Sequence, residues 1–485
     1  MSIRQLEPTA LWNHFADLNE VPRPSKHEER VIAFMQNFGR SLGLETHTDS
    51  VGNVIIKKPA TPGMEGRKTI VLQGHLDMVH QKNNNTVFDF DAEGIRSYID
   101  GDWVKAQGTT LGADNGIGVA SIMTLLASQD IPHPPLEALF TIDEETGMTG
   151  AKGLVENLLT GDVLLNLDSE EDNELTIGCA GGLNTNTTIR YAEEAASPGH
   201  TGLRISVSGL KGGHSGIEIH LGRGNANKIM NRLLYGMYER CGLRIASVDG
   251  GGLRNAIPRE SVAIVAVPED KMPAFQTELA QRSEDILREF HSVEPDLRIA
   301  AEPAPQPQKV MASADQTNLT RTIAAMPNGV YRMSPDIPGL VETSSNLARV
   351  EVQGGVFTTL SLQRSSIESG KAEIAQAIRA VFELAGAEVE HSGDYPGWAP
   401  NAASPLLARM VSTYEQLFGE KPHVAACHAG LECGIIGTHY PGMDMISFGP
   451  TIRHPHSPDE KVHIASVQKF WKYLLAIVQA TPERN

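Results

Sequence analysis

The sequence predicts an α/β fold in which a domain with a mixed, largely parallel sheet flanked by helices is interrupted by an α+β domain. Three observations support this. Short apolar strands alternate with helical segments up to about residue 200, half-exposed strands follow, and the first pattern returns near residue 395. At 485 residues the chain is also longer than one ordinary domain. We therefore expect a discontinuous domain, 1–200 and 395–485, and an inserted lid domain, 201–394.

In the first segment, residues 9–43 have apolar positions at three-to-four spacing, which is typical of helix. Short apolar, β-rich runs predict strands at 69–73, 136–142 and 163–167. Between them, 115–126 reads as an apolar helix that opens after an aspartate. Strands that alternate with helices favour a largely parallel sheet.

The inserted segment has a different sequence pattern. Its first strand alternates apolar and polar residues, which is typical of a half-exposed strand. The predicted elements are strands at 203–208, 262–267 and 357–363, and helices at 225–240, 271–290 and 371–384. A Pro-rich stretch, 301–318, is predicted to connect two similar α+β halves. In the final segment we expect a helix at 404–418, a strand within 443–449 and a closing helix from about 465.

Composition excludes some partners. Forty-one basic and 59 acidic residues give a net charge of −18, which disfavours binding to nucleic acid or to an anionic membrane surface.

The start of the chain lacks the basic and apolar regions of a signal peptide, and no apolar run reaches the ~18 residues of a membrane span. The four cysteines form no CxxC pair. We expect a cytoplasmic protein.

Side chains of the kind that bind metals follow the predicted strands. His75, Glu144, Glu145 and Asp168 each come just after a strand. Ligands of an open parallel sheet gather beyond the carboxyl ends of its strands, so these side chains are expected at one edge. Zinc binds imidazole and carboxylate groups, and paired ions lie about 3.5–4 Å apart. The pattern favours a two-metal hydrolytic site over hydrogen-bonded or solvated turns.

Two aspartates extend this pattern. Asp77 stands two residues after His75 on an extended segment, so it can accept the second ring N–H of a metal-bound His75. Asp114 lies in a glycine-rich turn before the predicted helix at 115. Such a turn suits a metal-bridging carboxylate, although a helix N-cap is the simpler explanation of an aspartate there.

The sequence leaves two choices open, one between two glutamates and one between two histidines. Glu144 and Glu145 are adjacent and diverge, so one can bind metal while the other acts as a general base. His456 is a ligand candidate in the last segment, and His454 is its rival.

The inserted domain has its own polar candidates. His214 lies between glycines on an adaptable loop, whereas Asn255 and Arg364 are isolated polar residues. Arg364 is suited to clamp a substrate carboxylate, and a surface ion pair is the alternative.

The whole pattern resembles the co-catalytic dizinc aminopeptidase and carboxypeptidase superfamily. Within it, the fullest resemblance is to the bacterial aminoacyl-histidine dipeptidases, and it runs almost end to end. The motifs that carry it are His75-x-Asp77, Gly112-Ala-Asp-Asn-Gly116, Glu144-Glu145-x-Gly147, Asp168-Ser-Glu170, Gly212-Gly-His-Ser-Gly216 and His456-Ser-Pro-Asp-Glu460. The segments 22–29 and 428–434 add to the match.

The resemblance implies a ligand set for two zinc ions, for which manganese or cobalt could substitute. One ion would be held by His75 and Asp168. The other would be held by Glu145 and His456, and Asp114 would bridge the two.

The resemblance also implies roles for the remaining residues. Asp77 would orient His75, Glu144 would be the general base, and the Asp114–Asn115 peptide bond would be cis. His214 would hold the substrate or polarise its scissile carbonyl. Asn255 and Arg364 would grip the substrate's C-terminal end.

The implied activity is hydrolysis of unblocked dipeptides with broad specificity, including Xaa-His dipeptides such as carnosine, by metal-activated water. An N-acyl-amino-acid deacylase or a carboxypeptidase of the same superfamily is the alternative, and a non-catalytic interaction module is a remote one. A dipeptide is the expected partner, and the chain is expected to be a monomer or a homodimer.

Overall fold

The computed structural model describes residues 2–484, which form two compact units. Within the described residues, the first unit comprises 2–178, 400–426 and 431–484, and the second comprises 179–399 and 427–430. The first boundary therefore lies near 178, not 200, because the strand at 181–190 pairs within the sheet of the second unit. The second boundary lies near 399, after the last strand of that sheet.

The first unit is an α/β unit built on an eight-stranded mixed sheet of order β1-β2-β6-β3-β7-β21-β8-β20. Its centre, β6-β3-β7-β21, is parallel, whereas β1 pairs antiparallel with β2, β2 with β6, and β8 with β21. The strands are β1 Glu45–Thr48, β2 Val54–Lys58, β3 Ile70–His75, β6 Leu136–Thr141, β7 Val163–Asn166, β8 Glu174–Cys179, β20 His423–Cys427 and β21 Asp444–Ser447. The central strands β3, β6 and β7 are buried along their whole length, as their mostly apolar sequences predict.

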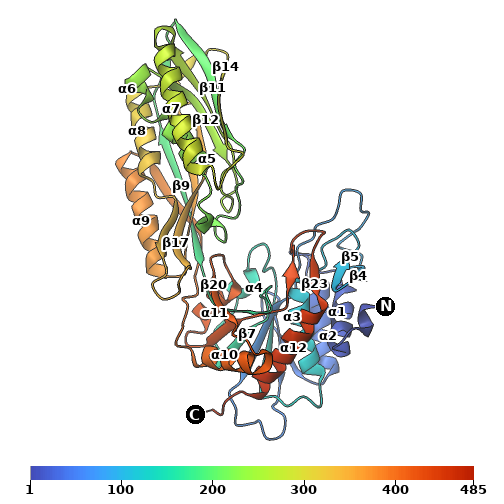
Figure 1. Cartoon of the computed structure of the whole chain (residues 1–485). Coiled ribbons are helices and arrows are strands. Elements are labelled where there is room, and N and C mark those ends of the chain that lie inside the picture. The colour runs from blue at the N-terminus through green and yellow to red at the C-terminus, as the bar shows by residue number, and fades with distance from the viewer. Residues whose placement is uncertain (1, 485) are drawn as a thin grey trace. The chain divides into compact units, whose positions relative to one another are not determined.

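Helices flank this sheet (Figure 1). They are α1 Thr9–Asn19, α2 Glu29–Ser41, α3 Ala113–Ala127, α4 Thr149–Lys152, α10 Pro405–Phe418, α11 Glu432–His439 and α12 Ile464–Gln479, with a short 3-10 turn at Ile3–Gln5. Helix α3 packs against β3 and is buried along almost its whole length. A smaller sheet of order β22-β23-β5-β4 adjoins them, with β4 Ser97–Asp100, β5 Trp103–Ala106, β22 Ile452–Arg453 and β23 Lys461–His463.

The second unit is built on one continuous antiparallel sheet of order β14-β11-β13-β12-β17-β18-β9-β19, and β16 pairs with β17. Its strands are β9 Gly181–Arg190, β11 His200–Ser208, β12 Arg244–Gly251, β13 Ser261–Pro268, β14 Arg298–Pro303, β16 Gly329–Met333, β17 Val341–Gln353, β18 Val356–Ser365 and β19 Glu388–Tyr395. A separate ribbon pairs β10 Glu193–Ala195 with β15 Lys309–Met311.

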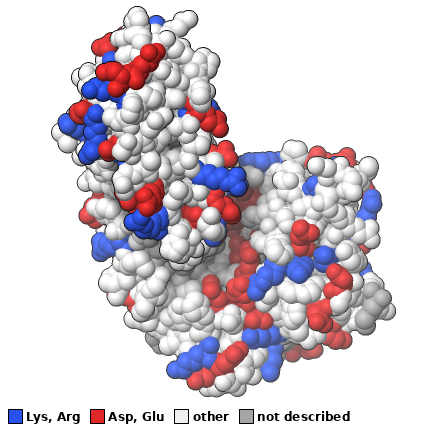
Figure 2. All heavy atoms as spheres, turned by 45° about the horizontal axis from the view of Figure 1, so that its top comes forward, with Lys and Arg blue, Asp and Glu red and all other residues white. Residues whose placement is uncertain are grey.

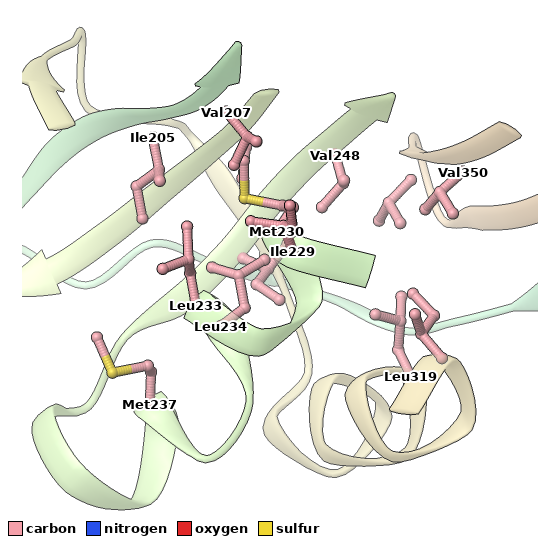
Figure 3. Close-up of a cluster of buried hydrophobic side chains, with 14 of the residues drawn as sticks. Ile205, Val207, Ile229, Met230, Leu233, Leu234, Met237, Val248, Leu319 and Val350 are labelled. Carbon is pink, nitrogen blue, oxygen red and sulfur yellow. The ribbon is translucent and has the colours of Figure 1, made fainter. Parts of the chain in front are cut away.

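Helices of the second unit cover its sheet and close an apolar core. They are α5 Ala226–Leu234, α6 Met237–Cys241, α7 Met272–Phe290, α8 Ser313–Ala325 and α9 Glu368–Leu384, with 3-10 turns at Ile219–Leu221 and Glu269–Lys271. In Figure 3, Met230 and Leu233 of α5 approach Ile205 and Val207 of β11. Burial of such side chains supplies the main driving force for this unit.

Three predicted elements differ from the structure. The helical segment at 9–43 is two helices, because prolines at 22 and 24 lie in the break between α1 and α2. The helix at 225–240 is interrupted by Gly236, which adopts a left-handed conformation. The segment at 301–318 is no simple connector, because it contains the end of β14, all of β15 and the start of α8.

Charged side chains of both signs lie on the surface of the molecule. Figure 2 shows basic and acidic side chains interspersed among uncharged ones on the visible face of each unit. None of the helices within residues 2–484 has the length and apolar character needed to cross a bilayer.

Candidate functional site

The parallel centre of the first sheet delivers its candidate side chains to one edge. His75 is the last residue of β3, Glu144 and Glu145 follow β6, and Asp168 follows β7. Because β3 pairs in parallel with both β6 and β7, the carboxyl ends of all three strands lie side by side. The structure thus brings together the strand-end residues that the sequence singles out.

Asp114 faces two histidines with its two carboxylate oxygens. Its Oδ1 lies 3.1 Å from Nε2 of His75, and its Oδ2 lies 3.3 Å from Nε2 of His456. The backbone of Asp114 departs from helical geometry within α3, with a ψ of 111°. Its two carboxylate oxygens contact the rings of His75 and His456, and each oxygen belongs to a different group of potential ligands.

Each group is completed by one further carboxylate. Nε2 of His75 lies 3.4 Å from Oδ1 of Asp168, and Nε2 of His456 lies 3.0 Å from Oε2 of Glu145. One oxygen or nitrogen from each member lies within 4.8 Å of the others in the groups His75–Asp114–Asp168 and Asp114–Glu145–His456.

These separations fit metal ions. Ligand atoms about 2.0–2.2 Å from a tetrahedral zinc ion lie roughly 3.4 Å from one another. In each group the imidazole nitrogen lies 3.0–3.4 Å from an oxygen of each of its two carboxylates. The donor types, imidazole nitrogen and carboxylate oxygen, are those that zinc and related divalent ions take. The residues present therefore fit a dinuclear metal site.

Asp77 holds two parts of the site at once. Its Oδ1 lies 3.4 Å from Nδ1 of His75, whose ring also contacts the backbone carbonyl of Asp77 at 3.1 Å. The same carboxylate accepts the backbone N–H groups of Glu144 at 3.0 Å and Glu145 at 3.3 Å. Asp77 can thus orient both His75 and the turn that carries the two glutamates.

The carboxylates of this site outnumber the positively charged side chains that could stabilise them. Burial raises the pKa of Glu144 well above its usual value, and burial also raises the pKa of Asp168 to about 6. Hydrogen bonds to Asp114 and Glu145 raise the pKa of His456 to about 11. A buried group of carboxylates that draws protons onto its neighbours is a group that a divalent cation would stabilise.

A second polar cluster lies within the second unit, on the loop that holds His214. Nδ1 of His214 accepts the backbone N–H groups of Gly216 at 3.1 Å and Ile217 at 3.0 Å. Burial and the nearby Arg364 lower the pKa of His214 to about 4. The ring is therefore neutral at pH 7, and its one proton resides on Nε2, from which it can be donated.

Arg364 is buried beside this loop without a carboxylate partner. Its side chain extends from β18 with a residue exposure of 5%, donates from Nη1 to the hydroxyl of Tyr395 at 2.7 Å, and leaves Nε unpaired. A Cβ atom at Gly216 would lie 3.0 Å from the ring of His214 and 3.1 Å from Nε of Arg364, so all three meet at this point. A buried guanidinium without a counterion is suited to bind an anion.

Comparisons with known proteins place the chain in a family. Residues 71–480 match the model of peptidase family M20/M25/M40. The chain belongs to this family. It is therefore a peptidase, and the predicted α/β fold and hydrolase class are confirmed.

Two similar proteins cover almost the whole chain. The cytosol non-specific dipeptidase of Escherichia coli K12 is 44% identical over 482 residues, which is 99% of each chain. The crystal structure of an aminoacylhistidine dipeptidase from Vibrio alginolyticus superposes with a TM-score of 0.95 at 46% identity, covering 100% of this chain and 99% of that one. The resemblance to these dipeptidases is thus confirmed. Aminopeptidase PepT from Bacillus cereus, with a TM-score of 0.56 and 18% identity, shares the fold.

The remaining predicted residues of this M20 peptidase are placed as follows. The Asp114–Asn115 peptide bond is cis. His454 is in none of the three groups of potential ligand atoms found among residues 2–484, although its backbone, like that of His456, has a positive φ. Asn255 is exposed, and its backbone carbonyl accepts the N–H of Ser215 at 2.8 Å, which places it beside the loop of His214.

The structure adds residues that the sequence did not single out for a role. Asn115 donates to the carbonyl of Leu167 and accepts the N–H of His75, so its amide links two ligand-bearing strands. Tyr395 holds Arg364, and His428 contacts Ser344 at 2.8 Å in the same unit. His428 lies in a motif that matches the family, which is the only signal in the sequence that points to it.

Proposed function

We propose that the chain is a dinuclear metallodipeptidase that hydrolyses unblocked dipeptides with broad specificity, including Xaa-His dipeptides such as carnosine. The observation that carries the proposal is the placement of Asp114, whose two oxygens face separate groups of ligands. The names of the Escherichia coli and Vibrio alginolyticus relatives support the substrate class.

Two zinc ions are the proposed cofactors, and Mn²⁺ or Co²⁺ would suit the same nitrogen and oxygen donors. His75 and Asp168 would hold one ion. Glu145 and His456 would hold the other, with Asp114 shared between them. When bound, the ions supply Lewis acidity that polarises a carbonyl and lowers the pKa of water.

Glu144 is the proposed general base. Asp77 accepts its backbone N–H, and one of its carboxylate oxygens lies within 4.8 Å of a ligand atom of His75 and of Glu145. Its carboxylate would take the proton of the attacking water and later deliver it to the nitrogen of the leaving amine. Burial raises its pKa, which favours a carboxyl that can both accept and return a proton.

His214 and Arg364 are proposed to bind the substrate. The neutral ring of His214 would donate from Nε2 to the scissile carbonyl oxygen as negative charge develops there. Arg364 would pair with the free C-terminal carboxylate, which supplies the anion that its buried guanidinium lacks. Asn255 would add a hydrogen bond to the same end of the substrate.

The test is hydrolysis of a substrate panel by protein of known metal content. We expect about two zinc ions per chain and turnover of free dipeptides, carnosine among them, with little turnover of N-acylated amino acids. The reverse preference would indicate the deacylase or carboxypeptidase alternative. A chain that binds no divalent metal would contradict the proposal.

We further propose a cytoplasmic location, in accord with the name of the Escherichia coli relative. Monomer and homodimer both remain compatible with the proposed activity, and light scattering on the purified chain distinguishes them.

A further inference from the structure

A buried carboxylate, Glu460, binds the turn that carries Asp114. Its Oε2 accepts the backbone N–H groups of Leu111 at 2.7 Å and Gly112 at 3.0 Å. Its Oε1 accepts those of Ala113 at 2.8 Å and Asp114 at 3.2 Å. Four consecutive N–H groups thus converge on one side chain, which is 2% exposed. Such a concave row of amides is a binding site for an anion.

Local geometry explains why the turn can form this row. Gly112 has a φ of +68°, a left-handed conformation that turns successive N–H groups to one side. A Cβ atom at this position would lie 2.5 Å from Nη2 of Arg23 and 2.9 Å from Sδ of Met78. Only glycine allows both the backbone conformation and the close approach of Arg23.

Arg23 joins the same turn to the end of β3. Its guanidinium donates to the carbonyl of Gly112 at 2.6 Å and to those of Leu76 at 3.0 Å and Asp77 at 3.2 Å. It also donates to Asn19 at 3.2 Å, and the residue is 1% exposed. A fully buried arginine therefore connects the segment that follows His75 to the turn that precedes Asp114.

Glu460 also connects that turn to the loop of His456. It lies four residues after His456, and its N–H donates to the carbonyl of Ser457 at 3.0 Å, which closes the loop. The segments that carry His75, Asp114 and His456 are consequently linked through two buried side chains. Neither side chain belongs to the two groups of ligand atoms.

We propose that Glu460 and Arg23 are positioning residues that fix the Asp114 carboxylate between the two histidines and so set the geometry of the dinuclear site. Burying another carboxylate beside an acidic cluster is unfavourable unless its hydrogen bonds offset the cost. The four amides provide those bonds. They also fix the position of the Asp114 carboxylate, which must be held accurately if it is to contact two metal ions. The inference rests on the proposed function, because it assumes that these ligands hold metal.

The chain offers a matched control in Glu137. This carboxylate is 3% exposed and accepts the backbone N–H groups of Thr160 at 2.8 Å and Gly161 at 3.0 Å. It lies near the start of β6, whereas Glu144 follows the end of that strand. Glu137→Gln therefore removes a similar buried carboxylate from the same unit, far along the strand from the ligands.

The experiment compares Glu460→Gln, Arg23→Lys and Glu137→Gln with the unmodified full-length chain. Each protein is stripped of metal, its folding is checked by circular dichroism, and zinc affinity is then measured by competition with a chelator. We expect zinc affinity to fall about 10- to 100-fold in Glu460→Gln and about tenfold in Arg23→Lys, as for other residues that support metal ligands. The visible spectrum of the cobalt-loaded protein should change in both variants. Glu137→Gln should lower the unfolding temperature but keep the zinc affinity and the cobalt spectrum.

Parent-like zinc affinity and cobalt spectra in both Glu460→Gln and Arg23→Lys would overturn the inference while leaving the proposed function intact. An equal loss of zinc affinity in Glu137→Gln would also overturn it, because the effect would then be one of general stability. If Glu460→Gln does not fold, Arg23→Lys decides the matter. Absence of zinc binding by the unmodified chain would instead overturn the proposed function, and the inference with it.

Discussion

The two units contain partly buried polar clusters of opposite character, and their histidines show the difference. In the first unit, hydrogen bonds to Asp114 and Glu145 raise the pKa of His456 to about 11. In the second unit, burial and Arg364 lower the pKa of His214 to about 4 and that of His428 to about 3. The same side chain is thus driven toward the charged form in one cluster and toward the neutral form in the other.

The sign of the excess charge in each cluster indicates the sign of the ligand that the cluster would bind. The first cluster has an excess of carboxylates, so it is suited to cations. The second has a buried guanidinium without a carboxylate partner, so it is suited to an anion. The proposed activity would use both, the first cluster to hold metal and the second to bind the free carboxylate of a dipeptide.

Removal of the proposed base should affect turnover and not metal binding. We expect Glu144→Ala to retain both zinc ions and to lose about 10²- to 10⁴-fold in kcat, the range typical of a general base. Metal analysis and steady-state kinetics on the same preparation measure both quantities. A variant that remained fully active would show that the assignment of the base is wrong.

Loss of a ligand should instead affect metal content and activity together. We expect His456→Ala to lower zinc from about two ions to about one per chain and activity on the order of 100-fold. His454→Ala is the matched control, since it lies in the same loop but outside both groups of ligand atoms. Unchanged zinc content in His456→Ala, with a loss in His454→Ala, would reverse the assignment of the two histidines.

In the second cluster, which contains the buried guanidinium, Arg364→Met should weaken binding of substrates that have a free carboxylate. A hydrogen bond to a charged group contributes about 1.5–3 kcal/mol, so KM for free dipeptides should rise roughly 10- to 150-fold. KM for the corresponding dipeptide amides, which lack the carboxylate, should change little. Equal changes for acids and amides would mean that Arg364 does not bind the carboxylate.

The smallest effect concerns stability and pH. The pKa of His428 in the folded chain, about 3, lies below its unfolded value of about 6.5, so the unfolded state binds more protons between these values. Stability contributed by the neutral ring is full above pH 6.5 and is lost as the pH falls toward 3. We expect the unfolding temperature of the unmodified chain to exceed that of His428→Asn at pH 7.5, and the gap to narrow by pH 5. A gap that widened at low pH would contradict this sign.

Much of the fold follows from local sequence patterns. The buried strands β3, β6 and β7 and the helices α7, α9 and α10 lie close to their predicted positions, because long periodic or uninterrupted apolar segments are strong signals. The sequence pattern does not predict that the strands of the second unit form a single antiparallel sheet. Its pairings join segments far apart in the chain, such as β9 with β18, and no local pattern specifies them.

The candidate site was predictable where a residue type coincides with a strand end, as for His75 and Asp168. The supporting residues were not. Arg23 acts mainly through backbone carbonyls and Glu460 through backbone N–H groups, and no local sequence pattern indicates such contacts. The distinction between His454 and His456 also depends on which ring faces Asp114, and this is settled only by the folded loop.

A crystal structure of the zinc-loaded chain with a non-hydrolysable dipeptide analogue, phased at the zinc absorption edge, tests the central claim most directly. The account predicts two anomalous peaks on either side of the Asp114 carboxylate and the carboxylate of the analogue against the Arg364 guanidinium. Peaks away from Asp114, or an analogue carboxylate that does not contact Arg364, would contradict it.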